Sequence, residues 1–135
     1  MVKQAVIRQV KSLSMSCDQV GNLLLLKFVF EGGGKDARIV VPASIVFWLL
    51  KHLPVNQDPS LQAPRGIPQI TQQDWDDHTT PRALSVQCKQ LAEALRMTFE
   101  IDPRTGLTVV LDGSNVELMR QMMENYRTDL IDLDA

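Results

Sequence analysis

The chain has 135 residues, of which 44% are hydrophobic and 22% are charged, and its formal net charge is −2. A chain of this length and composition buries roughly two-thirds of its unfolded surface, which predicts one globular domain and excludes a wholly disordered protein. No apolar run approaches the ~20 residues of a membrane span, and the N-terminus lacks a signal-peptide pattern, so we expect a cytoplasmic protein with no membrane partner.

The first third of the chain predicts three strands. Residues 12–18 alternate between apolar and polar with a period of two, which is typical of a half-buried strand. The β-branched residues within 2–11 favour an extension of this strand toward the N-terminus. Residues 23–30 and 38–41 form the next two predicted strands, and the three glycines at 32–34 indicate a hairpin turn between them.

A helix is predicted to begin near Pro42, Ala43 and Ser44, because proline is tolerated in the first turn of a helix. Its apolar residues wrap nearly the whole circumference: Ile45, Val46, Phe47, Trp48, Leu49, Leu50 and Leu53. A helix that is apolar all round is buried on more than one side. We therefore expect additional cover over this part of the protein, from the N-terminal segment, from the following joint or from a second copy of the chain.

Residues 54–82 interrupt this pattern, because five of the seven prolines lie there and apolar periodicity is absent. We interpret the stretch as an extended or irregular joint. Within it, residues 71–77 predict one turn of helix capped by Thr71. Trp75 is expected either to pack on the domain or to anchor a partner, since tryptophan is enriched among binding hot spots.

The remainder of the chain repeats the order of elements of the first part. Residues 84–88, 94–101 and 107–111 predict three strands. A helix follows, and Ser114 with Glu117 three residues later predicts a capping box at its start. The acidic tail ends in TDLIDLDA, where acidic and apolar residues alternate. We interpret this end as frayed, with a short docking peptide as the alternative.

An internal repeat explains this order. At an offset of 71, residues 12–31 match residues 83–102 at six of 20 positions, and the matches include the only two cysteines, Cys17 and Cys88. After a slip of one residue in the hairpin turn, the match resumes with Val40 and its counterpart Val110. Because the matches are collinear, we interpret them as an internal duplication.

The predicted fold is α+β, with a single domain over residues 1–135. It consists of repeat one (12–53), the proline-rich joint (54–82), repeat two (83–123) and the acidic tail (124–135). Neither copy is large enough to bury its sheet alone. We therefore expect the two β-β-β-α repeats to form one pseudo-twofold symmetric domain with a mainly antiparallel sheet.

The two copies differ on one strand face, and this difference indicates a partner-binding surface. Strand 23–30 carries Leu23, Leu25 and Val29 on the face turned away from the predicted core, whereas the matching face of strand 94–101 is mostly polar. We predict that these three residues and Trp75 bind a protein partner. Burial of the same leucines within the monomer is the alternative.

A second hypothesis is binding to single-stranded nucleic acid. The first eleven residues carry Lys3, Arg8 and Lys11 and no acidic residue, and the second copy adds Arg96 on a strand. The layout also resembles, in topology alone, the two-repeat sheet-and-helix proteins of the single-strand-binding Whirly type. This resemblance implies the same class of ligand and assigns no residue.

The sequence offers few groups for catalysis, and we expect neither an enzyme nor a cofactor. No histidine lies near Cys17 or Cys88 in the sequence to lower a thiol pKa, so we interpret both as buried structural thiols. His78 ends the motif DWDDH, whose spacing matches no known metal site, so no metal is predicted. The predicted function is a non-catalytic binding or adaptor protein that contacts a protein partner or a second copy of itself, with a homodimer as a plausible state.

Overall fold

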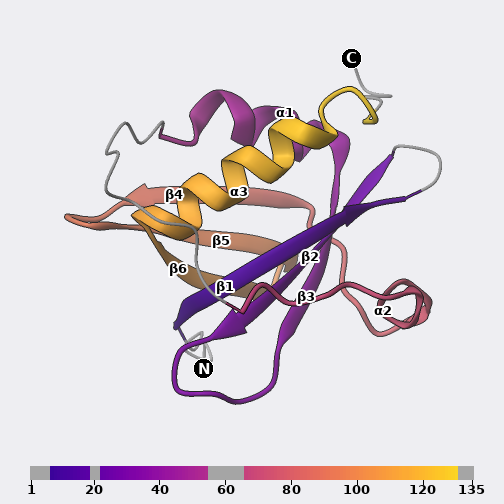
Figure 1. The fold of residues 1–135 in the computed structure, drawn as a ribbon, viewed down its shortest axis with the longest axis horizontal. Coiled ribbons are helices and arrows are strands. Elements are labelled where there is room, and N and C mark those ends of the chain that lie inside the picture. The colour runs from indigo at the N-terminus through magenta and orange to yellow at the C-terminus, as the bar shows by residue number, and fades with distance from the viewer. Residues whose placement is uncertain (1–6, 19–21, 55–65, 131–135) are drawn as a thin grey trace.

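The computed structural model describes residues 7–18, 22–54 and 66–130, and in them the elements follow the predicted order (Figure 1). The strands are β1 (Arg8–Cys17), β2 (Leu23–Phe30), β3 (Ala37–Pro42), β4 (Ser85–Gln90), β5 (Ala94–Asp102) and β6 (Thr105–Asp112). The helices are α1 (Ala43–His52), α2 (Gln72–Asp76) and α3 (Gly113–Tyr126). The fold is α+β, and no helix in the described part of the chain is long and apolar enough to cross a membrane.

The strands of the described residues form one six-stranded, mostly antiparallel sheet in the order β3-β2-β1-β6-β5-β4. Two antiparallel halves meet where β1 pairs with β6 in parallel. Here the second half repeats the order of the first, because its third strand and not its first lies beside β1. The strand order thus repeats from one half to the other, and the expected pseudo-twofold symmetry stays a prediction.

The second hairpin of each half has the register that the sequence repeat predicts. Leu24 of β2 lies opposite Val41 of β3, and their counterparts Leu95 and Leu111 lie opposite each other on β5 and β6. The agreement continues along both hairpins. This shared register is what two copies of one unit would show.

The first hairpin of each half departs from the repeat. Cys17 lies opposite Leu24, whereas Cys88 lies opposite Met97, two residues further along β5 than the repeat requires. Cys88 thus takes the place that Met15 has in the first half, and the predicted equivalence of the two cysteines is wrong. A shift of two residues is tolerated because side chains alternate with a period of two, so every residue keeps its face.

The backbone segment that enters β4 connects the two edges of the sheet. Val40 on β3 donates its N–H to Pro81 at 2.9 Å and accepts the N–H of Ala83 at 2.8 Å. The next residue, Leu84, donates its N–H to the carbonyl of Glu100 on β5 at 2.7 Å. Because adjacent residues bond to β3 at one edge and to β5 near the other, the sheet must curl around its core.

The core lies inside this curled sheet, where α1 and α3 pack beside each other (Figure 1). Phe28 of β2 meets Phe99 of β5 with ring centroids 6.2 Å apart, and both are fully buried. Val46 and Leu49 of α1 and Met119 of α3 are buried against them. Each large side chain buried in this way contributes roughly 1.5–3 kcal/mol to stability.

The two long helices begin at different kinds of cap. α1 begins at Ala43 directly after Pro42, as predicted. The cap of α3 is Asp112, whose carboxylate accepts the N–H of Asn115 at 2.8 Å. The predicted capping box that starts at Ser114 is therefore wrong. Aspartate caps a helix as well as serine does, and its negative charge suits the positive end of the helix.

The side chain of Asn115 fastens α3 to β1. It is 1% exposed, and its amide donates to the carbonyls of Val10 and Lys11 at 3.3 and 3.2 Å, where the β1–β2 register shifts.

We expect Asn115→Ala to lower the free energy of unfolding by about 1–3 kcal/mol, because buried carbonyls lose their donor. Denaturant-induced unfolding measures this loss. Asn125→Ala, at an exposed position of the same helix, is the control, and an equal loss in both variants would contradict the prediction.

Candidate functional site

The predicted partner-binding residues of β2 lie on the outer face of the first half of the sheet, and Trp75 of the joint packs on the same side. Leu25 is fully buried there, whereas Leu23 and Val29 are partly buried. Trp75 in α2 donates its indole N–H to the hydroxyl of Ser16 at 3.2 Å, and Ser16 is the β1 neighbour of Leu25. The structure thus brings Trp75 and Leu25 together, with the tryptophan packed on the domain and the predicted single turn of helix present as α2.

A cluster of charges holds the joint against this face. Asp74 of α2 is 7% exposed and pairs with Lys27 at 3.4 Å and with Arg38 at 3.0 Å. Lys27 and Arg38 lie opposite each other on β2 and β3, so cations from neighbouring strands share one carboxylate. Arg38 also pairs with Asp77, and Lys27 donates to the carbonyl of Gln69. On this strand face, the expected additional cover therefore comes from the joint of the same chain.

The surroundings of both carboxylates keep them ionised. Burial opposes the ionisation of Asp74, but the backbone N–H of Thr71 and the two neighbouring cations outweigh it and hold the pKa below its ordinary value. The pKa of Asp77 falls to about 2, because the hydroxyl and the backbone N–H of Thr79 donate to it and Arg38 pairs with it. Both carboxylates are therefore ionised at neutral pH.

Arg8, one of the residues predicted to bind nucleic acid, makes hydrogen bonds within its own chain at the surface. Its guanidinium donates to the carbonyls of Gly33 and Lys35, both at 3.0 Å. It also lies 3.8 Å above the ring of Phe30, a favourable cation–π distance. Gly32 to Gly34 all have positive φ, so this arginine closes a turn that only glycine adopts without strain.

The other predicted nucleic-acid residues are spread over the molecule. Lys3 lies outside the described residues. Lys11 is exposed on β1 and Arg96 is partly buried on β5, with β6 between these two strands. Arg96 lies directly opposite Lys89 of β4, and like charges in this position repel. Sequence reasoning did not find this cation pair, because it depends on the strand register.

The thiols and histidines offer little reactivity. Burial raises the pKa of Cys88 to about 11. Burial, followed by the charges of Asp18 and Asp129, also raises the pKa of Cys17. Both thiols stay protonated at neutral pH and are poor nucleophiles. His78 is exposed, and within the described ranges no group of three or more His, Cys, Asp or Glu side chains could hold a metal ion.

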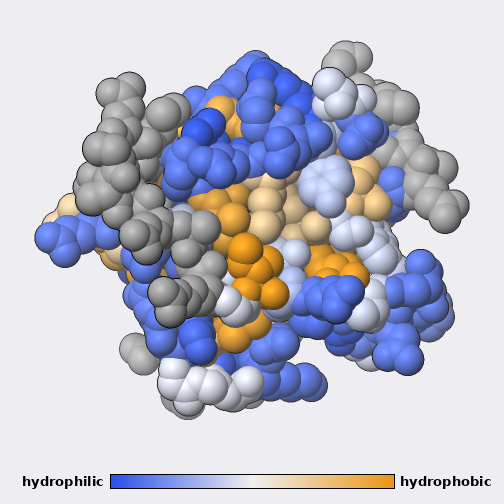
Figure 2. All heavy atoms as spheres, in the orientation of Figure 1, coloured by the Kyte–Doolittle hydropathy of each residue, from blue (hydrophilic) through white to orange (hydrophobic). Residues whose placement is uncertain are grey.

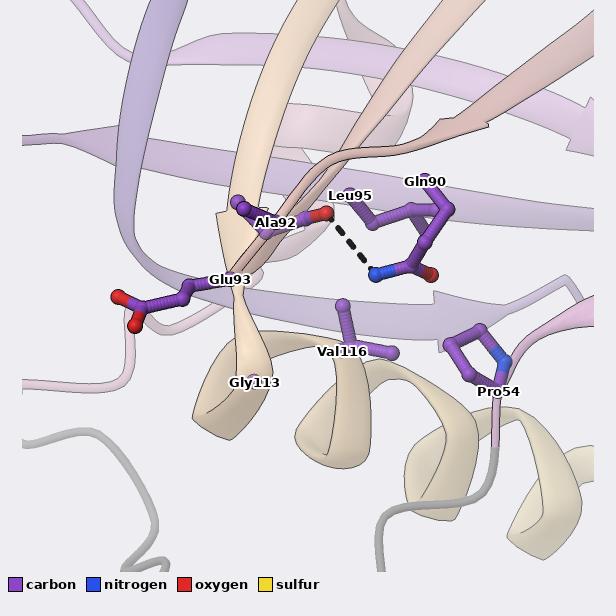
Figure 3. A pocket seen from close by; sticks show the side chains of 8 residues that line it. Pro54, Gln90, Ala92, Glu93, Leu95, Gly113 and Val116 are labelled. Atoms are coloured by element: carbon purple, nitrogen blue, oxygen red, sulfur yellow. Dashed lines mark hydrogen bonds between the residues drawn. The ribbon is translucent and has the colours of Figure 1, made fainter.

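A pocket of about 290 Å³ lies between the β4–β5 turn and the start of α3 (Figure 3). Leu95 and Val116 give it an apolar lining. The amide of Gln90 donates to the carbonyl of Ala94 at 3.2 Å, and Glu93 points away from the other labelled side chains. Because these polar groups do not converge on one point, the pocket offers no arrangement for acid–base or nucleophilic chemistry.

A second cavity of about 280 Å³, here named the α1–β4 groove, exposes apolar side chains. Four large hydrophobic residues of the described chain are exposed, and two of them, Trp48 (40%) and Leu84 (62%), line this groove. The Trp48 ring packs on His52 with centroids 4.2 Å apart. The full lining consists of Ser44, Ile45, Trp48, Leu84, Ser85 and Val86.

Sequence reasoning did not assign this groove to a partner. The signal was present in the first helix, which is apolar on every side and therefore carries more apolar surface than one packing face can bury. Trp48 is on the side of α1 that remains partly exposed. In the apolar–polar alternation of its strand, Leu84 has the position of a core-facing residue. It lies, however, where the chain enters the last strand of the sheet, so little of its side chain is covered.

The surface of α3 is polar, in contrast to that of the apolar helix α1. Figure 2 shows largely hydrophilic atoms over α3 and α2, and the largest gathering of hydrophobic atoms lies between them. Part of the polar surface of α3 consists of ion pairs one turn apart, Glu117 with Arg120 and Glu124 with Arg127. This helix thus offers a solvated surface, in contrast to the apolar groove at α1.

Comparisons with protein-family models, curated proteins and solved structures find no significant match to this chain. No residue role is therefore carried over from another protein. Function is inferred from the surfaces described above.

We expect the charge cluster beneath the joint to make the protein less stable in acid. Both Asp74 and Asp77 have lowered pKa values, so below about pH 4 the unfolded state binds more protons than the folded state. The stability that they contribute is complete above that pH and is lost as the pH falls through their folded values. In the double variant D74N/D77N, the free energy of unfolding should be lower at pH 7 and should decline less steeply in acid. Denaturant-induced unfolding between about pH 2.5 and pH 7 measures both effects.

Asp76→Asn is the matched control, because Asp76 lies in the same helix, is exposed and accepts from Gln72 rather than from the two strand cations. This variant should keep the acid slope of the wild type. An unchanged slope in D74N/D77N would show that the cluster does not contribute in this way.

Proposed function

We propose that this chain is a non-catalytic binding or adaptor protein that acts through protein–protein contacts at the α1–β4 groove. The observation that carries the proposal is the exposure of Trp48 and Leu84 in one groove. Tryptophan is enriched among residues that dominate binding energy. Exposed apolar patches on monomers mark interaction sites, because a partner that covers them gains the burial energy that folding left unused.

The strand face predicted from the sequence supports the same function less directly. Leu25 is already fully buried, and the joint is held over its neighbours by the Asp74 cluster. A partner could reach Leu23, Leu25 and Val29 only after the joint had moved away. The groove requires no such rearrangement, and most pre-organised complexes form with little backbone change.

The charge around the groove indicates the chemistry of the partner. Helix α1 and residues 81–86 carry Lys51 and Arg82 and no acidic residue. Glu100 on the neighbouring strand is the nearby carboxylate, and it accepts the hydroxyl of Ser85 at 3.1 Å. An apolar groove with a mostly cationic rim is complementary to a partner that combines apolar and acidic residues.

We also propose an internal duplication as the origin of the chain and a homodimer as its oligomeric state. An internal duplication is supported by the repeated element order and by the common register of the second hairpins. A homodimer is supported by the exposed groove, since a second copy is one way to cover it. We further propose that the protein works in the cytoplasm.

A photo-crosslinking amino acid in place of Leu84 tests the groove. In cells of the source organism it should form crosslinks to a protein, either a different one or a second copy of this chain, and Trp48→Asp should reduce their yield about tenfold. Mass spectrometry of the crosslinked species measures this. The same amino acid in place of Ile67, which is 46% exposed on the joint, is the control. Equal crosslinking from both positions would count against the groove.

One observation favours the second hypothesis, binding to single-stranded nucleic acid. Lys89 and Arg96 form a cation pair that makes no ion pair with a carboxylate within the described residues, and phosphate would relieve their repulsion.

If this pair binds nucleic acid, a gel shift with short single-stranded oligonucleotides should appear at low salt, weaken at high salt and disappear in K89Q/R96Q. Absence of a shift at low salt would eliminate this hypothesis. Lys51→Gln, which leaves the pair intact, is the control.

A further inference from the structure

Strand β4 is an edge that another strand can join. Among the described residues it is the last strand in the sheet order, and it pairs with β5 on one side only. The opposite edge, β3, is already covered in part by the backbone of Pro81 and Ala83. An exposed edge presents unpaired N–H and C=O groups, and an extended peptide binds there by forming a further ladder. The geometry therefore favours strand addition at β4.

The two faces beside this edge differ in chemistry. Leu84 and Val86 point to the side of α1, where Trp48 completes the apolar groove. Lys89 lies on the other face, directly opposite Arg96. Because side chains alternate along a strand, an added strand places every second residue in the apolar groove and the residues between them beside the cations. The matching segment alternates apolar and acidic residues.

The chain itself contains such a segment. Residues 131–135 read Ile-Asp-Leu-Asp-Ala, so Ile131 and Leu133 share one face of a strand, and Asp132 and Asp134 share the other. These residues lie outside the described part of the chain. Leu130 directly before them is 6% exposed and donates its N–H to Tyr126 at 3.1 Å, which fixes the point from which the segment starts. Five extended residues span up to about 17 Å, the length of an average strand.

We infer that the α1–β4 groove binds residues 131–135 of a second copy of this chain as an added strand beside β4. Ile131 and Leu133 occupy the groove near Trp48 and Leu84, and the two aspartates face Lys89 and Arg96. A reciprocal exchange between two copies closes a symmetric dimer. This inference rests on the proposed function as a protein-binding chain and names the partner of the groove.

The test uses the full chain with Ile131→Asp and Leu133→Asp, which keeps its length but lacks the apolar residues of the segment. The synthetic peptide TDLIDLDA is titrated into this variant while tryptophan emission is recorded. We expect a saturable change that weakens as salt is raised, because the charges of Lys89 and Arg96 are screened. A peptide of the same composition whose order breaks the alternation should produce no change.

Three further variants of the same chain assign the binding to the groove. Trp48→Phe should abolish the emission change, and Leu84→Asp should weaken peptide binding about tenfold or more. Leu84 is 62% exposed and Trp48→Phe keeps an aromatic ring, so we expect both variants to fold. Ile67→Asp, which alters an equally exposed apolar residue on the joint, should bind as before. Loss of binding in that control, or full binding with Leu84→Asp, would overturn the assignment.

Sedimentation of the wild type over a range of concentrations identifies the source of the segment. We expect association that disappears with Ile131→Asp and Leu133→Asp and that added peptide inhibits. A wild type that stays monomeric while the peptide binds would overturn docking between copies. Failure of the peptide to bind at millimolar concentration would overturn the inference itself, whereas crosslinks from position 84 to a different protein would still support the proposed function.

Discussion

The backbone from Pro81 to Leu84 imposes the constraint on which the other features of the structure depend. It hydrogen-bonds to Val40 on β3 and, one residue later, to Glu100 on β5, although β3 and β4 are the two ends of the sheet order. A sheet whose ends are tied together must curl. The curl brings the rings of Phe28 and Phe99 into contact and encloses the core with α1 and α3. It also leaves β4 as the edge beside α1, where the groove lies.

The charge cluster under the joint holds the joint over the apolar outer face of β2. Leu25 is fully buried although it points away from the main core, so the joint must stay in place over β2. Burying the Asp74 carboxylate costs solvation free energy. This cost is offset by the positive charges of Lys27 and Arg38 and by the hydrogen bond from the Thr71 backbone N–H. A stretch rich in proline, which offers few backbone donors for a ladder, is therefore attached mainly through side chains.

The two candidate surfaces show how the functional interpretation changed between sequence and structure. The sequence indicated an excess of apolar residues in the first half and assigned it to Leu23, Leu25 and Val29 of β2. The structure confirms the excess but covers that face with the joint, while Trp48 of α1 remains 40% exposed. Leu84, read as a core residue, completes the exposed surface because it belongs to the edge of the sheet. The proposed partner surface therefore lies on the helix that was already expected to need cover.

The positions of the strands and of the two long helices were predicted correctly from the sequence. Alternation and turn residues placed all six strands, and the apolar periodicity with its flanking residues placed the two long helices, because these signals depend on neighbours within a few positions. The cap of α3 was misplaced by two residues, since Asp112 and Ser114 are both good caps and only the end of β6 selects between them. The repeat also predicted the register of the second hairpins, where turn lengths and side-chain patterns agree.

Only the tertiary structure decided which strands are neighbours, which residues are exposed and which charges meet. The parallel contact between β1 and β6 depends on Arg8 and Val109, which are far apart in the sequence. The position of Cys88 depends on how tightly the chain turns into β5. Asp74 meets Lys27 and Arg38 only because the joint folds back over the sheet. The amino-acid sequence determines the faces of each element through periodicity, whereas long-range packing determines what each face meets.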